Sequence, residues 1–287
     1  MISILIPTYN YNSAPLVHDL HEQLLRANIA FEILLADDAS TLYIDENRAV
    51  NDLPNCRFIE LEKNIGRARI RNFLADKAQY PYLLFLDGDM RIRKSDFVET
   101  YLTFCQGECA VVGGCDYDPE MWKPQYSLRM KYGTEREGNM HYARTFLTAN
   151  FMISKSLFQQ VRFDENIHGY GHEDTIFGLK TKELVEITHI DNPATHCGLD
   201  ENRIYIAKTE ESIGNLLLLY QTRHLPELLA DSKLLSMYAK MKRWRMTCPI
   251  ALFFRITKPL AIRLLCKKNP NLLLFDIYKL GFICTLI

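Results

Sequence analysis

Short apolar runs alternate with helix-like segments over the first 115 residues of this 287-residue chain. Five runs have the length and composition of buried strands: Ile2–Ile6, Phe31–Ala36, Arg57–Leu61, Tyr82–Leu86 and Ala110–Gly113. Between them, apolar residues from Leu16 to Leu25 recur at helical spacing, with Pro15 suited to the first turn. Gly66–Ala78 predicts a second helix, and Ser95 is the expected N-cap of a third.

This alternation of strands and helices predicts an α/β fold with a parallel sheet that is covered on both faces. In such sheets, ligands bind outside the carboxyl ends of the strands. Three loops at those ends therefore carry candidate chemistry, namely Pro7–Asn10, Asp37–Ser40 and Asp87–Asp89.

Residues 116–146 show no clean period and hold several aromatic residues, including Trp122, among charges, glycines and prolines. A long irregular insertion of this kind is typical of a lid or a binding loop. A strand-like run at Phe146–Ile153 and a short helix from Ser154 follow, and Thr175–Leu184 reads as another helix before a loop that contains His196.

The composition is that of a globular protein, with 48% hydrophobic and 24% charged residues. A net charge of −1 argues against a chain built to bind nucleic acid. This average hides ten Lys or Arg residues, and no Asp or Glu, between Ser232 and Phe275. The N-terminal apolar run lacks the basic residues of a signal peptide, and no uncharged apolar stretch is long enough to span a membrane, so we expect a cytoplasmic protein.

Two carboxylates follow the strand at Tyr82–Leu86, at Asp87 and Asp89. Side chains two apart on an extended chain point the same way, so both would leave the sheet edge on one side. Paired oxygen ligands of this kind suit Mg²⁺ or Mn²⁺. The alternative is a solvated Asp-Gly-Asp turn, because Asp and Gly are ordinary turn residues.

Adjacent carboxylates also follow the second strand, at Asp37 and Asp38, where they could accept hydrogen bonds from a nucleotide base or a ribose. Alternatively, Asp or Ser in this loop caps the next helix. Gly66 starts the second helix, and Arg67 and Arg71 share one of its faces. A helix N-terminus with guanidinium groups beside it favours a pyrophosphate.

Together, five motifs make the chain resemble the GT-A fold glycosyltransferases of family 2 over about residues 1–200. They are Pro7-Thr8-Tyr9-Asn10, Asp37-Asp38-Ala39-Ser40, Asn64-Ile65-Gly66 with Arg71-Asn72, Asp87-Gly88-Asp89 and Gly171-His172-Glu173-Asp174. The segment from Gly169 to Asp174 also resembles a galactosyltransferase-type C-terminal motif. Two residues depart from these patterns: Ile70 stands where Ala is frequent, and Tyr170 stands where that motif has Trp, although Tyr can still stack on a sugar ring.

The resemblance implies a Rossmann-like nucleotide-binding sheet with an acceptor-side subdomain. Residues 1–115 would form the half that binds the nucleotide sugar, and residues 116–230 the acceptor-binding and catalytic half. Residues 231–287 would form a helical, basic and apolar tail.

The resemblance also implies roles for individual residues. The residues expected to bind the nucleotide-sugar donor are Pro7, Thr8, Asn10, Asp37, Asp38, Asn64, Arg67, Arg71, Asp87 and Gly88. The expected ligands of a Mn²⁺ or Mg²⁺ ion are Asp87, Asp89 and His196, and a structural role for the histidine is the alternative. Tyr170 and Trp122 would contact the acceptor.

In similar enzymes the Asp of the Glu-Asp pair is the catalytic base, which implies this role for Asp174. In an inverting transfer, that base takes the proton of the acceptor hydroxyl as its oxygen attacks C1 of the sugar. Glu173 would hydrogen-bond one of the sugars. The alternative is that the two acids only complement the dipole of the helix that they begin.

The function that the resemblance implies is transfer of a sugar from a nucleotide-diphosphate donor to a glycan or lipid-linked saccharide in surface polysaccharide synthesis. A sugar-nucleotidyltransferase is the alternative enzyme, but it would want a Gly-rich basic loop after the first strand, where this chain has Pro7–Asn10. A catalytically silent membrane-bound scaffold is the non-enzymatic alternative.

The tail mixes basic residues with Trp244, Phe253 and Phe254. This mixture is typical of a segment that lies on an anionic membrane, which predicts a peripheral location at the inner face of the membrane. The alternative is a helical cap on the catalytic domain. Basic and aromatic residues would also suit a nucleic acid, but nothing else in the sequence supports one.

Overall fold

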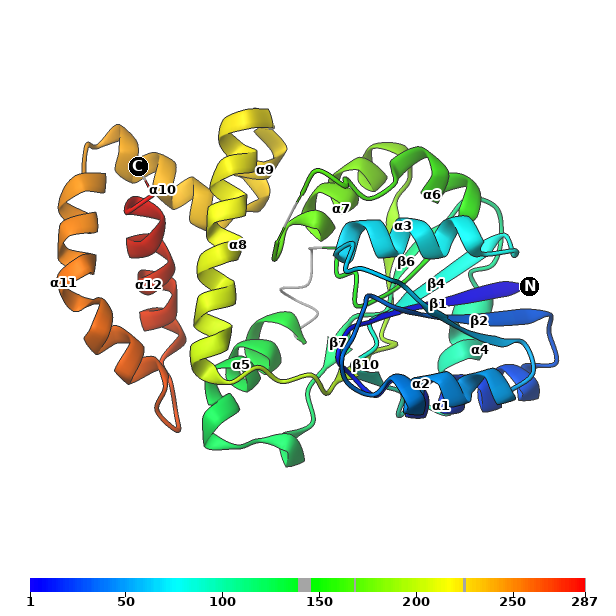
Figure 1. The fold of residues 1–287 in the computed structure, drawn as a ribbon. Coiled ribbons are helices and arrows are strands. Elements are labelled where there is room, and N and C mark those ends of the chain that lie inside the picture. Colours follow the sequence, from blue (N-terminus) through cyan, green and yellow to red (C-terminus); the bar gives the residue numbers. More distant parts are fainter. Residues whose placement is uncertain (139–145, 168, 224–225, 287) are drawn as a thin grey trace. The chain divides into compact units, whose positions relative to one another are not determined.

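The computed structural model describes residues 1–138, 146–167, 169–223 and 226–286 (Figure 1). The chain divides into two compact units. The first consists of Met1–Asp118, Glu137–Asn166 and Glu173–Gly198, and the second of Pro119–Arg136, Ile167–His172 and Leu199–Ile287. These units are defined by compactness, so the functional halves expected to meet at residues 115 and 230 stay a prediction.

The first unit is built on a seven-stranded sheet with the order β3-β2-β1-β4-β8-β6-β9. In that order the strands are Cys56–Glu60, Phe31–Asp37, Ile2–Thr8, Tyr82–Leu86, Asn150–Ser154, Ala110–Val112 and Ile187–His189. All five strands predicted before residue 115 form, and they run in one direction. Strand β8 lies antiparallel between β4 and β6, so the sheet is mixed, whereas the pattern indicated a parallel sheet.

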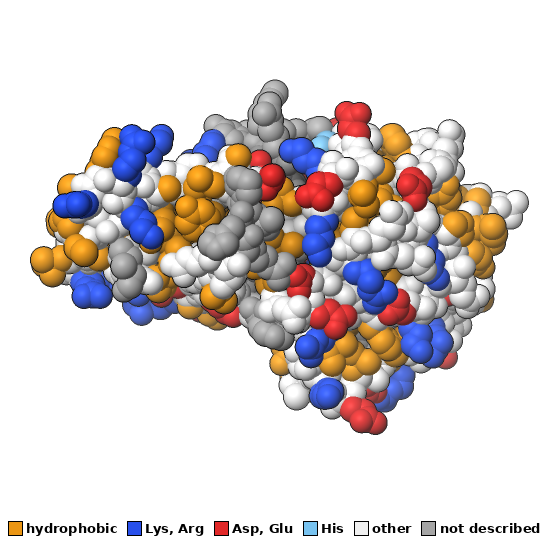
Figure 2. All heavy atoms as spheres, turned by 90° about the horizontal axis from the view of Figure 1, so that it is seen from above, with side chains coloured by type: hydrophobic (Ala, Val, Ile, Leu, Met, Phe, Trp, Pro, Cys, Tyr) orange, Lys and Arg blue, Asp and Glu red, His pale blue; other side chains and the backbone are white. Residues whose placement is uncertain are grey.

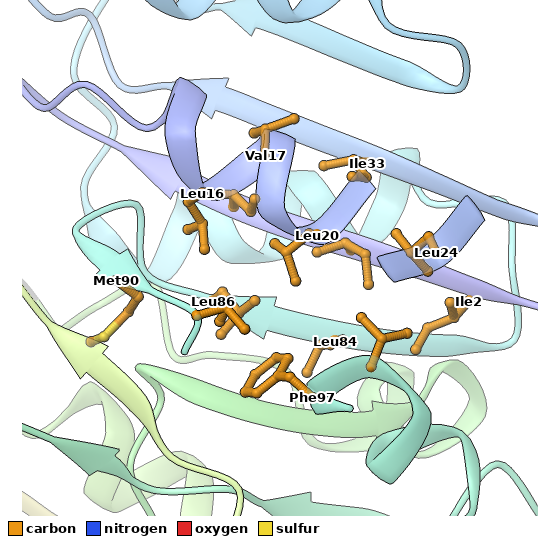
Figure 3. Packing of buried hydrophobic residues seen from close by; sticks show 14 of the residues in the cluster. Ile2, Leu16, Val17, Leu20, Leu24, Ile33, Leu84, Leu86, Met90 and Phe97 are labelled. Carbon is orange, nitrogen blue, oxygen red and sulfur yellow. The ribbon is translucent and has the colours of Figure 1, made fainter. Parts of the chain in front are cut away.

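Side chains alternate between the two faces of this sheet, as strand geometry requires. Leu84 and Leu86 of β4 join a core that also holds residues of α1 and α4, and Figure 3 shows Leu16, Leu20 and Leu24 of α1 in this core. Leu83 and Phe85 of β4 point the other way, into a second core that contains residues of α3, α6 and α7. The helices of the first unit are α1 Ala14–Ala27, α2 Ile44–Arg48, α3 Arg67–Lys77, α4 Phe97–Leu102, α6 Lys155–Val161 and α7 Glu173–Leu184.

The predicted helix starts agree with the structure except at α4 and at α7, which begins at Glu173 and not at Thr175. Pro15 lies in the first turn of α1, and Ser154 is the N-cap residue of α6. The expected N-cap of α4 was Ser95, but the cap position is held by Asp96, whose side chain makes no capping hydrogen bond. The helix therefore starts one residue later than its composition indicated.

A small second sheet, with the order β5-β10-β7, lies in the same unit. Its strands are Met90–Arg91, Ala194–His196 and Cys115–Asp116. Strand β10 runs antiparallel to β5, with His196 opposite Met90. This register brings His196 beside the residue that precedes Met90, which is Asp89.

The second unit is helical. It holds α5 Ser127–Tyr132, α8 Asn202–Arg223, α9 Pro226–Asp231, α10 Lys233–Arg243, α11 Thr247–Leu265 and α12 Leu272–Cys284. Helix α5 and short turns fill the described part of the insertion that the sequence left irregular, and residues 139–145 of that insertion lie outside the described residues. Aromatic rings join these helices, for example Phe254 of α11 and Tyr278 of α12, whose centroids are 5.0 Å apart. None of the helices within the described residues is long and apolar enough to cross a membrane.

Candidate active site

The loops after β1 and β2 are tied to each other by Asn10 and Ser40. The backbone N–H of Asn10 donates to Oγ of Ser40 at 2.7 Å, and Oδ1 of Asn10 accepts from the backbone N–H of Thr41 at 2.8 Å. Asn10 has a positive φ of 51°, a conformation that Asn tolerates better than most residues. The side chain of Asn10 thus fixes the shape of two loops at the carboxyl edge of the sheet.

The two adjacent acids after β2 have different partners. Oδ1 of Asp37 accepts the backbone N–H of Ser40 at 2.7 Å, while its buried Oδ2 has no hydrogen-bond partner among the described residues. Asp38 accepts the backbone N–H groups of Ile65 at 2.7 Å and Gly66 at 3.0 Å. Burial raises the pKa of Asp38 even though these two donors favour its charged form.

Asp38 therefore holds the turn that leads into α3, and the side chain of Asn64 donates to the backbone carbonyl of Asp38 at 3.0 Å. Gly66 is the N-cap residue of α3 with φ of 85°, a conformation that side chains rarely adopt. These contacts aim the N-terminus of α3 at the same edge of the sheet as the β1 and β2 loops.

Arg71 of α3 is the most connected side chain of the site, although only 2% of it is exposed. Its Nη2 donates to Oδ1 of Asp87 at 2.5 Å, and its Nη1 lies 3.7 Å from Oε1 of Glu173. Nη1 also donates to the backbone carbonyl of Arg67, and the guanidinium lies 5.6 Å from the ring centroid of Phe163. One buried cation therefore joins the end of β4 to the start of α7.

The two flanking arginines of α3 are far more exposed than Arg71. Half of the Arg67 side chain is exposed, and its Nη1 lies 4.0 Å from Glu173. Arg69 is 48% exposed and lies 3.6 Å from Glu165. The predicted pairing of Arg67 and Arg71 on one face thus holds in the structure, since both approach Glu173.

Gly88 lets the turn after β4 close against the β1 loop. Its backbone N–H donates to the carbonyl of Pro7 at 3.1 Å, and its carbonyl accepts from Oγ of Ser13 at 2.9 Å. A Cβ at this position would lie 2.6 Å from Oγ of Ser13 and 2.9 Å from Cβ of Thr8. The glycine between the two acids is therefore a steric requirement.

The two acids of this turn also differ in their partners. Asp87 is bound to Arg71, whereas Oδ2 of Asp89 lies 3.4 Å from Nε2 of His196. Gly198 packs directly on the Asp89 carboxylate, because a Cβ there would overlap it. The buried Nδ1 of His196 has no hydrogen-bond partner among the described residues.

A carboxylate beside an imidazole is a donor set that suits Mn²⁺. Within the residues that the structure describes, no group of three or more His, Cys, Asp or Glu side chains is arranged to hold a metal ion. Divalent cations at phosphate-transfer sites are commonly held by one or two carboxylates together with the substrate's own phosphates. The pair of Asp89 and His196 fits that arrangement, with Asp87 next to it in the chain.

The acid pair at the start of α7 lies in a poorly solvated environment. Burial raises the pKa of Glu173, and the neighbouring Asp174 adds to this, while Arg71 and Arg67 oppose it. Burial also raises the pKa of Asp174, against the hydrogen bonds that its Oδ1 accepts from the backbone N–H of Thr175 at 2.6 Å and from its hydroxyl at 3.3 Å. A carboxylate with a raised pKa is suited to accept a proton.

The predicted acceptor residues Tyr170 and Trp122 belong to the second unit. The ring of Tyr170 lies 5.5 Å from Nζ of Lys208, and the backbone N–H of Tyr170 donates to Glu211 at 2.9 Å. Trp122 is 37% exposed, and its ring lies 5.5 Å from Nζ of Lys268. All other predicted site residues belong to the first unit.

Sequence reasoning missed four residues that shape this edge: Ser13, Ser40, Tyr11 and Gly198. Burial raises the pKa of Tyr11 to about 12, and the neighbouring Cys197 and Asp89 add to this, so its hydroxyl stays protonated. Ser40 lay within a predicted motif, but the sequence did not show that its hydroxyl contacts Asn10 and so joins the loops after β1 and β2. Gly198 follows Thr195-His196-Cys197 directly, so its place in the chain was the available signal.

The solved structures with a similar fold are glycosyltransferases with the GT-A architecture, and this chain has that fold. A mannosyltransferase from Pyrobaculum calidifontis, in complex with GDP-Man and Mn²⁺, is 13% identical with a TM-score of 0.57, and the match covers 99% of this chain and 85% of that one. Residues 1–349 of S. aureus TarS, in complex with UDP, are 17% identical with a TM-score of 0.51 over 75% of this chain and 65% of that one. At these identities the likeness concerns the fold alone.

A comparison with known protein families matches residues 3–162 to Glycosyl transferase family 2. Because this match covers more than half of the chain, the chain belongs to that family. The family predicted from the five motifs is thereby confirmed.

Two curated relatives also match. A teichoic acid poly(glycerol phosphate) polymerase of Staphylococcus epidermidis is 26% identical over 151 residues, which are 49% of this chain and 20% of that protein. An uncharacterized glycosyltransferase of Rickettsia conorii is 30% identical over 172 residues, 58% of this chain and 28% of that protein. The chain thus covers less than a third of the length of either relative.

Arg71→Gln should lower the free energy of unfolding by about 3–5 kcal/mol, because it leaves Asp87 and the buried Glu173 without their shared cation. Denaturant unfolding at neutral pH measures this. Arg69→Gln is the matched control on the same helix, and it should cost no more than about 1 kcal/mol, since its partner is exposed. Equal losses in the two variants would contradict the role of Arg71.

Gly88→Ala should lower the free energy of unfolding by about 1–3 kcal/mol, because the added Cβ forces Thr8 and Ser13 away from the turn. Thermal or denaturant unfolding measures the loss. Gly214→Ala in α8 is the control: nothing lies within 4 Å of its added Cβ, and Ala favours a helix interior by about 0.8–1 kcal/mol. The two alanines should therefore have effects of opposite sign, and two losses would contradict the packing argument.

Proposed function

We propose that this chain is an inverting, metal-dependent glycosyltransferase that moves a sugar from a nucleotide-diphosphate donor to a glycan or lipid-linked saccharide in surface polysaccharide synthesis. The observation that carries the proposal is the contact of one buried cation, Arg71, with both Asp87 at 2.5 Å and Glu173 at 3.7 Å. This contact couples the turn after β4, where the diphosphate would bind, to the acid pair at the start of α7.

The donor would bind at the carboxyl edge of β1, β2 and β4. The loops there are joined by hydrogen bonds and lie together in one unit. Asp38 and Asn64 would shape the pocket for the base, with Pro7, Thr8 and Asn10 lining it and Asp37 near the ribose. Arg67, which is half exposed at the N-terminus of α3, is the arginine best able to reach the diphosphate, because Arg71 is buried against protein carboxylates.

Asp89 and His196 would hold a Mn²⁺ or Mg²⁺ ion, with Asp87 beside them. Such an ion, when bound, would offset the negative charge of the departing nucleotide diphosphate. The closeness of the carboxylate and the imidazole, 3.4 Å, supports this assignment, and so does the packing of Gly198 on Asp89.

Asp174 would be the general base. It would take the proton of the acceptor hydroxyl while that oxygen bonds to C1 of the sugar and the bond from C1 to the phosphate oxygen breaks. Its raised pKa supports proton uptake, and Glu173, held by Arg71, would orient a sugar hydroxyl. Tyr170, in the galactosyltransferase-type motif, and Trp122 would contact the acceptor sugar.

The relatives are compatible with the proposal. One is a teichoic acid poly(glycerol phosphate) polymerase, and the two solved structures described above contain UDP or GDP-Man. A polymer built on a lipid carrier would also give a reason for the basic tail, which we propose brings the enzyme to the inner face of an anionic membrane. The direct test is nucleotide release from a panel of nucleotide sugars with Mn²⁺, and no release from any donor would overturn the proposal.

Asp89→Asn should retain the fold and lose most turnover, because the remaining amide is a much weaker metal ligand than a carboxylate. Nucleotide release measured over a Mn²⁺ series should show both a lower rate and a higher metal requirement. Asp45→Asn is a matched control, since the side chain of Asp45 is 91% exposed on α2. An unchanged metal requirement in Asp89→Asn would contradict the assignment.

Asp174→Asn should lower kcat by at least about a hundredfold, the usual range for loss of a general base. Donor affinity should change little. In the unmodified enzyme, kcat should fall as the pH is lowered through the raised pKa of Asp174, because the protonated carboxyl cannot accept a proton. A pH–rate profile measures this, and the acidic limb should vanish in the variant. A collapse of donor affinity with kcat retained would instead make Asp174 a donor ligand.

A further inference from the structure

Helix α11 has two apolar faces, and among the described residues only one of them packs against protein. Ala251, Phe254 and Leu265 are buried, and the ring of Phe254 contacts Tyr278 and Phe282 of α12. This face joins α11 to the rest of the helical unit. An amphipathic helix would carry polar residues on its other face.

The outward face of α11 is apolar instead. Leu252, Phe253, Ile256 and Leu260 are 63%, 67%, 72% and 58% exposed. Their spacing places them along one stripe of the helix, since residues three or four apart lie on the same face. We call these four residues the outer stripe. Large side chains exposed in a continuous row mark a surface that binds a partner.

The charged residues of α11 itself are all basic, and one of them, Lys258, is paired with Glu210 of α8 at 2.7 Å. Arg255 and Arg263 lie on the exposed part of the same helix, each three residues after a member of the stripe. Ser232–Phe275 as a whole carries ten Lys or Arg and no Asp or Glu. Figure 2, with the C-terminal helices at the left, shows basic side chains beside hydrophobic ones on this unit.

An exposed apolar stripe with basic residues beside it favours an anionic bilayer as the partner. Two copies of this surface would bring basic segments together, so like charges would oppose a self-complementary dimer. An anionic bilayer offers both an apolar interior for the stripe and negative headgroups for the arginines and lysines. None of the helices within the described residues could span a membrane, so α11 would lie in the plane of the interface.

We propose that the outer stripe of α11 inserts into the surface of an anionic bilayer, with Arg255 and Arg263 at the headgroups. This inference deepens the proposed function. It rests on that function only for the reason why the enzyme would bind a membrane, which is a lipid-linked acceptor. Exposed Trp244, just before α11, would lie at the headgroup level, where indole rings are favoured.

The experiment is co-sedimentation of the full chain with vesicles of phosphatidylcholine alone and with one quarter phosphatidylglycerol. We expect binding to the anionic vesicles that is at least about tenfold stronger than to the neutral ones. Phe253→Ser with Ile256→Ser, and separately Arg255→Gln with Arg263→Gln, should each weaken it at least about tenfold. Leu25→Ser with Leu42→Ser is the matched control, because these leucines are 55% and 54% exposed on the first unit, and it should bind like the unmodified chain.

A second readout reports insertion directly. In a Trp122→Phe background, Trp244 is the one remaining tryptophan, and its emission should shift to shorter wavelength with anionic vesicles. A failure of the unmodified chain to bind anionic vesicles would overturn the proposal. So would self-association in solution that the Phe253→Ser, Ile256→Ser variant abolishes without any effect on vesicle binding.

Nucleotide release from a soluble donor separates this inference from the proposed function. The stripe variants should release nucleotide at the rate of the unmodified chain, because these residues lie outside the proposed catalytic machinery. Vesicle binding without any nucleotide release would leave the membrane surface standing and overturn the transferase. Nucleotide release without vesicle binding would support the transferase and overturn the membrane surface.

Discussion

The site depends on a single buried guanidinium. Arg71 is 2% exposed, and a charge in such a place is tolerated only with partners of opposite sign. Its partners, Asp87 and Glu173, come from segments that are far apart in the sequence, one after β4 and one at the start of α7. The cation thereby links the turn after β4 directly to the start of α7. Loss of either acid would leave the buried Arg71 with one carboxylate partner in place of two.

The three residues of the Asp87-Gly88-Asp89 turn have different roles, because Asp87 is already paired with Arg71. Asp87 neutralises Arg71, and Gly88 allows the turn to close on Thr8 and Ser13. Asp89 is left beside His196, which strand β10 brings there through its antiparallel register with β5. Two identical side chains separated by one residue thus acquire different chemistry from their neighbours alone.

The sequence predicted the features that depend on local patterns of residues. Apolar runs located the five strands, their alternation with helices gave the α/β class, and the family followed from five short motifs. It could not reveal that β8 would lie antiparallel inside the sheet, because a short apolar run carries no signal of its direction. Nor could it show that Arg71 is buried and Arg67 half exposed, since helical spacing placed both on one face. The contact of Gly198 with Asp89 depends on how the small sheet pairs, which no spacing encodes.

The ionised acid pair at the start of α7 destabilises the folded chain. Burial raises the pKa of both Glu173 and Asp174 above that of an unfolded chain, so the contribution of each to stability is present at low pH and is lost as the pH rises through the raised pKa. Arg71 lies 3.7 Å from Glu173 and limits this loss for that residue. For Asp174, the bonds from Thr175 and the two arginines oppose burial but do not cancel it. The raised pKa of Asp174 thus rests on burial alone, and this is the property on which its proposed role as a base depends.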